Sequence, residues 1–146
     1  MEVEIKTEPG RQEPKIVILA GEESEELRRL AESLSKLTVG PVPVSRGDEK
    51  LLLPQREFLR FYTDGKGVSA QTAGETYAVH LRLYELEERL GRSDFFRASK
   101  STIINFNQIQ SLRPDFGGRM LVQMKNGEKL YVSRQYVPVL KRKLGL

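Results

Sequence analysis

Residues 95–105 read FFRASKSTIIN, two apolar segments separated by a polar one. The apolar segments are short and rich in aromatic and β-branched residues, which is typical of strands, so the residues between them are predicted to form a turn. This stretch offers two cations, Arg97 and Lys100, and two hydroxyls, Ser99 and Ser101. Such side chains suit contacts with phosphates and base edges, although an ordinary solvated turn would have the same composition.

A second segment with similar chemistry lies at residues 130–144, LYVSRQYVPVLKRKL. A strand pattern ends there and a helix begins, with Ser133 as the predicted N-cap. Arg134 is then expected to project from the strand–helix junction, where free backbone N–H groups also attract phosphate. Pro138 requires that the helix begin near Gln135 or later, because proline has no N–H for an interior turn. The alternative interpretation is a capping serine beside a surface arginine.

Short strand patterns fill the chain around these two segments. From Lys50 onward, turn signals recur at intervals of roughly 8–12 residues, which favours a mainly β fold of the β-rich α+β kind. The strongest hairpin signal is Asn126-Gly127. Asn105 is expected to tie a turn to the backbone. Strands are expected at residues 51–53, 58–62, 68–72, 76–80, 95–97, 103–105, 108–113, 119–125 and 129–132, and helices at 81–90 and up to 144. The expected core residues of this region include Phe95, Phe96, Ile103, Ile104, Ile109, Tyr131 and Val137.

The N-terminal residues have a different pattern, which predicts a β-β-α extension over residues 1–45 and a separate domain over 46–146. The predicted elements are strands at 3–5 and 15–20, a helix at 22–37 and a Pro/Gly-rich linker at 38–48. Two strands and one helix cannot bury a core of their own. We therefore expect the extension to form a homodimer with a second copy; the alternatives are that it caps the C-terminal domain or packs on another protein.

Charge is distributed unevenly along the chain. Residues 1–45 carry 6 Lys and Arg against 9 Asp and Glu, a net charge of −3, whereas residues 46–146 carry 18 against 11, a net charge of +7. The stretch 91–146 alone carries 11 against 3, a net charge of +8. A basic segment beside an acidic one indicates an anion-binding surface and makes nucleic acid a candidate partner.

Residues for enzyme chemistry are scarce. The chain has no cysteine and one histidine, His80, so neither a thiolate site nor a His/Cys metal cluster is available. Gly65-Lys66-Gly67 lacks the residues of a phosphate-binding loop, and no serine stands in a Gly-x-Ser-x-Gly motif. We expect no catalytic activity, cofactor, metal or small-molecule substrate. No apolar run is long enough to span a membrane, and the N-terminus is polar, so we expect a cytoplasmic protein without membrane insertion.

In order and spacing, the two segments together resemble the LytTR DNA-binding domain. That family's signature is a Phe-x-Arg box that closes on Ile/Val-Asn, then an isoleucine, an Asn-Gly or Asp-Gly hairpin, and Val-Ser-Arg-x-Tyr opening the last helix. The matching residues here are Phe96-Arg97-Ala98-Ser99-Lys100-Ser101, Ile103-Ile104-Asn105, Ile109, Lys125-Asn126-Gly127 and Val132-Ser133-Arg134-Gln135-Tyr136. The preceding helix, LYELE at 83–87, also looks like the family's Leu-x-Glu-Leu segment. The resemblance covers roughly residues 47–146.

The resemblance implies a stack of small antiparallel sheets that reads double-stranded DNA with loops in successive major grooves. Carried over, the resemblance implies base contacts at Lys100 supported by Ser99, at Arg134, and at a third position in the loop 64–68, which we assign to Lys66. Phosphate contacts are then expected from Lys66, Arg97, Ser101 and Lys141. Gln135 stands where the family often has a basic residue, which weakens the phosphate contact there.

The residues before the LytTR-like region are too few for a phosphoacceptor receiver domain, and the first aspartate is Asp48. The expectation is therefore a standalone regulator that binds sequence-specific DNA as promoter direct repeats or paired half-sites. A protein-interaction module whose basic face binds an acidic partner is an alternative. An RNA-binding module is a third, although the predicted contact loops hold Lys, Ser and Arg rather than the stacking aromatics that RNA recognition favours.

Overall fold

The computed structural model describes residues 1–11, 14–35, 41–90 and 94–146. The chain divides into two compact units, Met1–Lys36 and Leu37–Leu146. The second unit contains every strand of the described residues and all of their buried apolar side chains.

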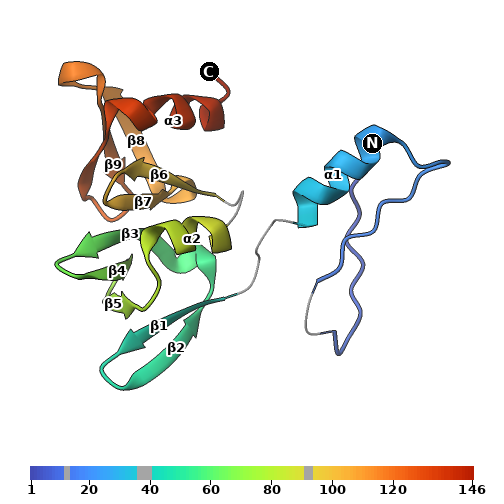
Figure 1. Ribbon diagram of the computed structural model, residues 1–146, viewed down its shortest axis with the longest axis horizontal. Coiled ribbons are helices and arrows are strands. Elements are labelled where there is room, and N and C mark those ends of the chain that lie inside the picture. Colours follow the sequence, from blue (N-terminus) through green and yellow to red (C-terminus); the bar gives the residue numbers. More distant parts are fainter. Residues whose placement is uncertain (12–13, 36–40, 91–93) are drawn as a thin grey trace. The chain divides into compact units, whose positions relative to one another are not determined.

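Two antiparallel sheets build the second unit (Figure 1). Within the described residues, one sheet has seven strands in the order β2-β1-β5-β4-β3-β7-β6, and the other has three in the order β10-β9-β8. The strands of the first sheet are β1 (Val42–Arg46), β2 (Glu49–Leu53), β3 (Phe58–Asp64), β4 (Gly67–Thr72), β5 (Thr76–Val79), β6 (Phe95–Ser99) and β7 (Thr102–Asn105). Those of the second are β8 (Ile109–Pro114), β9 (Met120–Met124) and β10 (Lys129–Val132). This confirms the mainly β prediction, including the hairpin at Asn126-Gly127, where Gly127 has a φ of 91°.

Alternation along the strands gives the seven-stranded sheet two buried faces. Ile103 packs with α2 (Leu83–Leu90) in one core cluster, while Ile104 packs with α3 (Val137–Leu144) and the three-stranded sheet in another. Phe95 and Phe96 divide in the same way. Consecutive strand residues point to opposite faces, so two adjacent apolar residues bury one side chain on each face. The sheet therefore lies between α2 on one side and α3 with the three-stranded sheet on the other.

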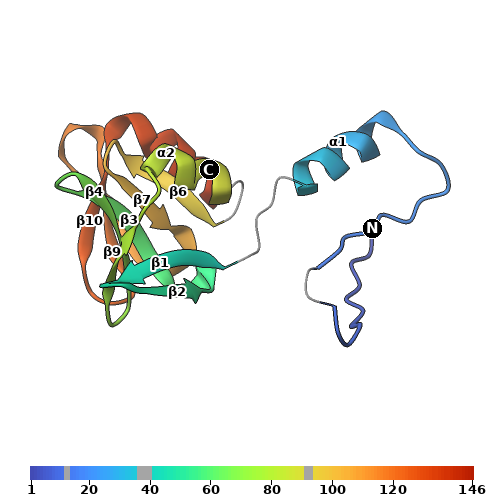
Figure 2. The same ribbon diagram turned by 60° about the horizontal axis from the view of Figure 1, so that its bottom comes forward.

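The start of this unit differs from the prediction. The segment 38–48 was expected to be a linker, but Val42–Arg46 forms strand β1, which pairs with β2 in a hairpin in the lower part of the unit in both views (Figures 1 and 2). Val42 and Val44 are each only 1% exposed, and their burial outweighs the presence of Pro43 between them. On its other side, β1 pairs with β5 only at Ser45. Pro43 has no partner residue in β5, so its missing N–H removes no hydrogen bond between these two strands.

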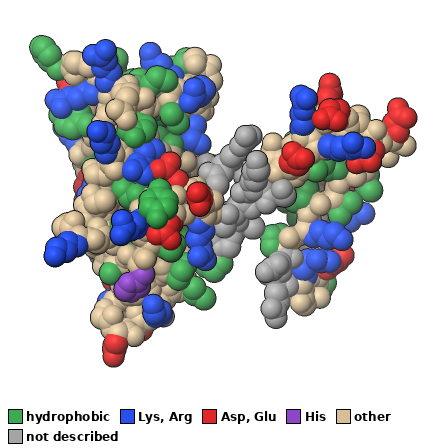
Figure 3. Space-filling view, in the orientation of Figure 1, with side chains coloured by type: hydrophobic (Ala, Val, Ile, Leu, Met, Phe, Trp, Pro, Cys, Tyr) green, Lys and Arg blue, Asp and Glu red, His purple; other side chains and the backbone are tan. Residues whose placement is uncertain are grey.

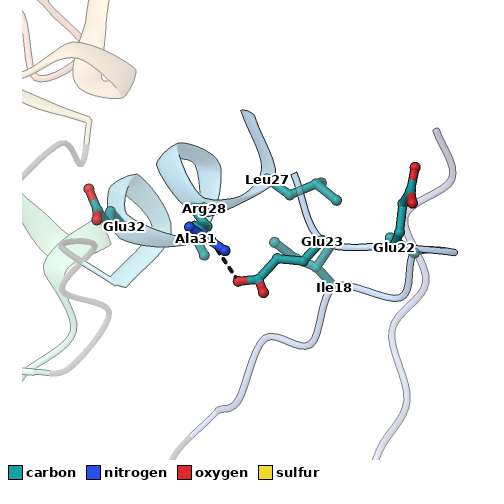
Figure 4. A pocket seen from close by; sticks show the side chains of 8 residues that line it. Ile18, Glu22, Glu23, Leu27, Arg28, Ala31 and Glu32 are labelled. Carbon is teal, nitrogen blue, oxygen red and sulfur yellow. Dashed lines mark hydrogen bonds and ion pairs between the residues drawn. The ribbon is translucent and has the colours of Figure 1, made fainter. Parts of the chain in front are cut away.

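The N-terminal unit contains α1 (Glu25–Ser35), which confirms the predicted helix at 22–37 except that it begins three residues later; residues 36–37 of the prediction lie outside the described residues. The Oγ of Ser24 accepts a hydrogen bond from the Leu27 N–H at 3.2 Å and caps the helix start. The strands predicted at 3–5 and 15–20 are wrong, because neither segment has a partner strand in the described residues. An open hollow of about 480 Å³ lies beside α1 (Figure 4). Its lining residues are Ile18, Ala20, Glu22, Glu23, Leu27, Arg28, Ala31 and Glu32.

Candidate nucleic-acid interface

Two of the predicted contact loops lie at the same edge of the seven-stranded sheet. β3 and β6 both pair antiparallel with β7, so they run in the same direction and end at one edge. The β3–β4 turn (residues 64–67) therefore lies beside the β6–β7 turn (residues 99–101). A hydrogen bond connects them directly, since the Thr63 N–H donates to the Ser101 carbonyl at 2.9 Å. This neighbourhood could not be read from the sequence spacing.

A bulge in β6 brings the third loop to this edge. The pairing of β6 with β7 shifts register between Arg97 and Ser99, which leaves Ala98 without an opposite residue. The freed Ala98 carbonyl accepts a hydrogen bond from the Ser133 N–H at 2.8 Å. Arg134 follows at once, in the 3-10 helix η4 (Arg134–Tyr136) before α3. In Figure 1 the ends of β3 and β6 and the start of α3 all lie on the left side of this unit. We call residues 64–67, 99–101 and 134 together the contact edge.

Each loop of the contact edge presents an exposed cation. Lys66 lies in a tight turn in which Asp64 pairs with Gly67 and Gly65 has a φ of 63°. Lys100 lies at the tip of the β6–β7 turn, where the Ser99 Oγ accepts a hydrogen bond from the Ser101 N–H at 3.2 Å. Three cations from separate segments thus occupy one edge.

The strand–helix junction that carries Arg134 and Gln135 is formed by the backbone. The Ser133 carbonyl accepts from the N–H groups of Tyr136 and Val137, at 2.8 and 3.2 Å. The Ser133 side chain makes no capping hydrogen bond, so the predicted side-chain cap is wrong. α3 begins at Val137 with its proline in the first turn, as the sequence required. Arg134 and Gln135 are both exposed.

Two of the predicted phosphate contacts differ from the other site residues, because Lys141 lies further along α3 and Arg97 is bonded within the protein. Lys141 is exposed in the last turn of α3, seven residues after Arg134. At about 1.5 Å of rise per helical residue, seven residues correspond to about 10 Å along the helix axis. Arg97 lies next to the contact edge, but its guanidinium is bonded within the protein. Its Nε–H donates to the Ser99 carbonyl and an Nη2–H to the Lys100 carbonyl, both at 2.8 Å, and Nη1 pairs with Glu87.

Comparison with known proteins identifies the unit that carries this edge. The family model of the LytTr DNA-binding domain matches residues 48–145. The chain belongs to the LytTR family. A solved LytTr DNA-binding domain of a methyl-accepting/DNA response regulator from Bacillus cereus has a similar fold, with a TM-score of 0.69 and 26% identity over 73% of this chain and 98% of that one. The predicted stack of antiparallel sheets is thereby confirmed as the LytTR fold.

Named relatives are similar over the LytTR domain. The sensory transduction protein LytT of Bacillus anthracis is 41% identical over 83 residues, 57% of this chain and 33% of the relative. LytT of Bacillus subtilis is 30% identical over 70% of this chain and 43% of the relative. An HTH-type transcriptional regulator of Staphylococcus aureus is 33% identical over 62% of this chain and 60% of its own length. The chain thus spans only part of the length of these relatives. None of its described helices meets the length and hydropathy needed to cross a bilayer.

The LytTR domain also holds residues near the contact edge that sequence reasoning did not single out. Glu87, on α2, pairs with Arg97 ten residues away. Gly118, in the β8–β9 loop, lies against Arg134, and Phe116 in the same loop is 89% exposed. The Gly117-Gly118 dipeptide signals a turn in the sequence, but its neighbour in space comes from another segment.

Two predicted core residues of the LytTR domain are not fully buried, since Ile109 is partly buried against the second core cluster and Tyr131 lies at the surface. Tyr131 is 47% exposed, and the Arg119 guanidinium lies over its ring at 3.9 Å from the centroid. By contrast, Asn105 is 2% exposed, and its Nδ2 donates to the Phe58 carbonyl at 2.9 Å while its Oδ1 accepts from the Asn107 N–H at 3.0 Å. The prediction that Asn105 ties a turn to the backbone is confirmed.

One view shows where the charged side chains of the LytTR domain lie (Figure 3). Lys and Arg side chains cover the end with the three-stranded sheet and α3 and also occur lower on the domain, whereas most of the Asp and Glu side chains in this view gather near α2. This distribution agrees with the net charge of +8 in residues 91–146. A polyanion would therefore be attracted to the end of the domain that carries Arg134.

Proposed function

We propose that this protein regulates transcription by binding double-stranded DNA in a sequence-specific manner, with the loops of the contact edge inserted in the major groove. The observation that supports this most directly is the convergence of Lys66, Lys100 and Arg134 at one edge of a LytTR domain. Their loops come from three separate segments, and backbone hydrogen bonds at 2.8 and 2.9 Å connect them. A rigid set of exposed cations is suited to a duplex, because the grooves and phosphates of DNA are equally regular.

The side chains have the chemistry that base recognition needs. Arg134 can bond the O6 and N7 acceptors of guanine in a bidentate manner, and Lys100 or Lys66 can reach the same acceptors. The hydroxyls of Ser99 and Ser101 and the amide of Gln135 can donate to base edges or phosphate oxygens. Lys141, one helix length further on, suits a phosphate outside the recognised bases. We assign Arg97 a different role below.

Selection of target sites from a random pool of duplexes tests this function. We expect one consensus to be enriched, and the affinity for it to fall with salt, with a slope of log K on log [salt] of several units, since each neutralised phosphate contributes about −0.9. Single-stranded RNA and an acidic peptide serve as competitors. No enrichment at low salt contradicts the proposal, and a preference for the RNA or the peptide would favour the corresponding alternative.

We also propose that the N-terminal unit makes the protein a homodimer. Its apolar side chains at Ile16, Val17 and Leu19 are 63%, 63% and 89% exposed, and its net charge of −3 opposes contact with DNA. A second copy would cover apolar surface of this kind and would double the number of half-sites bound, with a gain in effective concentration. Because its ligand is chromosomal DNA, the protein is expected to act in the cytoplasm. Sedimentation of the full chain measures the oligomeric state.

A further inference from the structure

We propose that Arg97 and Glu87 form a clamp that holds the β6–β7 turn in the conformation that presents Lys100 to DNA, so that both are positioning residues and neither contacts the nucleic acid. The inference rests on the proposed function. It assigns Arg97 a role that its place in a basic, DNA-binding segment does not suggest.

The guanidinium of Arg97 bridges two successive carbonyl groups of the turn. Its Nε–H donates to the Ser99 carbonyl and an Nη2–H donates to the Lys100 carbonyl, both at 2.8 Å. Because the guanidinium is planar, its donors fix the orientation of both peptide groups at once. The Arg97 side chain is only 20% exposed, which limits its reach toward a ligand.

The carbonyls of the turn are therefore all used inside the protein. The next one, from Ser101, accepts a hydrogen bond from the Thr63 N–H at 2.9 Å. DNA presents acceptors, namely phosphate oxygens and the N7 and O6 atoms of guanine, and these would be repelled by free carbonyl oxygens. With three successive carbonyls bonded within the protein, the turn offers DNA the ammonium group of Lys100 and the neighbouring hydroxyls.

Glu87 keeps Arg97 in this position. Its carboxylate pairs with the Nη1 group that the turn leaves free. Glu87 lies on α2, whose Leu83, Leu86 and Leu90 are at most 4% exposed, so the carboxylate stands on an element fixed in the core. The negative charge of Glu87 also offsets the positive charge of the guanidinium, and this opposes the attraction that would otherwise draw Arg97 out to a phosphate. A turn that is ordered before binding loses less entropy when DNA binds, and this favours the matched sequence.

The decisive variant is Glu87→Gln, with Glu88→Gln as the matched control. Both remove one negative charge from α2, but Glu88 is exposed and has no ion pair in the part of the chain that the structure describes. We compare affinities for the selected duplex and a scrambled one at a single salt concentration. The clamp predicts that Glu87→Gln lowers the ratio of the two affinities about tenfold relative to Glu88→Gln. A loss of about tenfold is the size expected when one good base contact is lost.

If Arg97 instead contacts a phosphate and Glu87 merely restrains it, Glu87→Gln strengthens binding to both duplexes and leaves the ratio unchanged. That result overturns the clamp. Arg97→Lys gives an independent check, because it retains the charge and loses the fork; it should lower the ratio without changing the salt slope. Because Glu87 is exposed, Glu87→Gln should fold, and it tests the clamp even if Arg97→Lys does not fold.

A measurement without DNA separates this inference from the proposed function. The amide order parameters of Lys100 and Ser101 in the free protein report the rigidity of the turn on the ps–ns timescale. They should fall in Glu87→Gln and Arg97→Lys and stay unchanged in Glu88→Gln. Unchanged order parameters in the first two variants overturn the clamp even if the parent protein binds DNA. A parent protein that selects no duplex overturns the proposed function, whatever the turn does.

Discussion

Gly118 lies directly against the side chain of Arg134. A Cβ atom built on Gly118 would stand 3.1 Å from the Cδ and 3.2 Å from the Cγ of Arg134, tighter than ordinary van der Waals contact. The backbone of Gly118 has a φ of 79°, in the region that favours glycine. The β8–β9 loop thus forms a surface along which the aliphatic part of Arg134 lies, and it limits the directions in which the guanidinium can point.

Gly118→Ala should therefore displace Arg134 and lower the preference of the protein for its selected duplex. The left-handed backbone should also cost about 1–2 kcal/mol of unfolding free energy. Gly117→Ala is the matched control, since Gly117 has a φ of 74° but nothing within 4 Å of its Cβ position. Both variants should lose similar stability in urea unfolding, and only Gly118→Ala should lose sequence preference. Equal preferences would mean that the contact does not orient Arg134.

Arg134→Ala is expected to reduce discrimination between the selected and a scrambled duplex by about 1–3 kcal/mol, the value of a bidentate base contact. The fold should be unaffected because Arg134 is exposed. Arg56→Ala removes the same charge from η1 (Gln55–Glu57), at the opposite end of β3 from the contact edge. Equilibrium titrations of both variants on both duplexes measure the difference. If the two variants lose the same affinity and keep the same preference, Arg134 acts only through its charge.

Asn105→Ala should lower the free energy of unfolding by about 1–3 kcal/mol, because it leaves the Phe58 carbonyl and the Asn107 N–H without their buried side-chain partner. Asn107→Ala removes the same kind of side chain from an exposed position and should have little effect. Urea unfolding monitored by circular dichroism compares the two. A stable Asn105→Ala protein would show that water replaces the lost hydrogen bonds.

Deletion of residues 1–36 should leave a folded LytTR domain, because both core clusters begin at or after Val42. The truncated protein should be a monomer that still prefers its half-site and binds the full site more weakly. Deletion of residues 1–45 should instead lower the unfolding free energy by about 3–6 kcal/mol, since it removes the buried Val42 and Val44. Sedimentation and thermal unfolding of the three proteins test this, and a full chain that is monomeric contradicts the dimer.

Residue patterns alone were enough to predict the strand-rich fold, the hairpin at Asn126-Gly127 and the role of Asn105. These features depend on local alternation, on turn residues that few conformations tolerate, and on a signature with fixed spacing. Local pattern was misleading at Val42–Arg46, where two valines flank a proline. Whether such a segment is a strand or a linker depends on whether a core lies within reach, and that core is supplied by residues far along the chain.

The residues that surround the candidate interface are set by tertiary packing and not by local pattern. The bonds from Ser133 to Ala98 and from Thr63 to Ser101 connect residues more than thirty positions apart, and their partners are set by strand register and by one bulge in β6. The same holds for Arg97, which the sequence presents as a free cation. Its bonding to Glu87 follows from the packing of α2 beside β6, because an ion pair between two elements leaves no periodicity in the sequence of either.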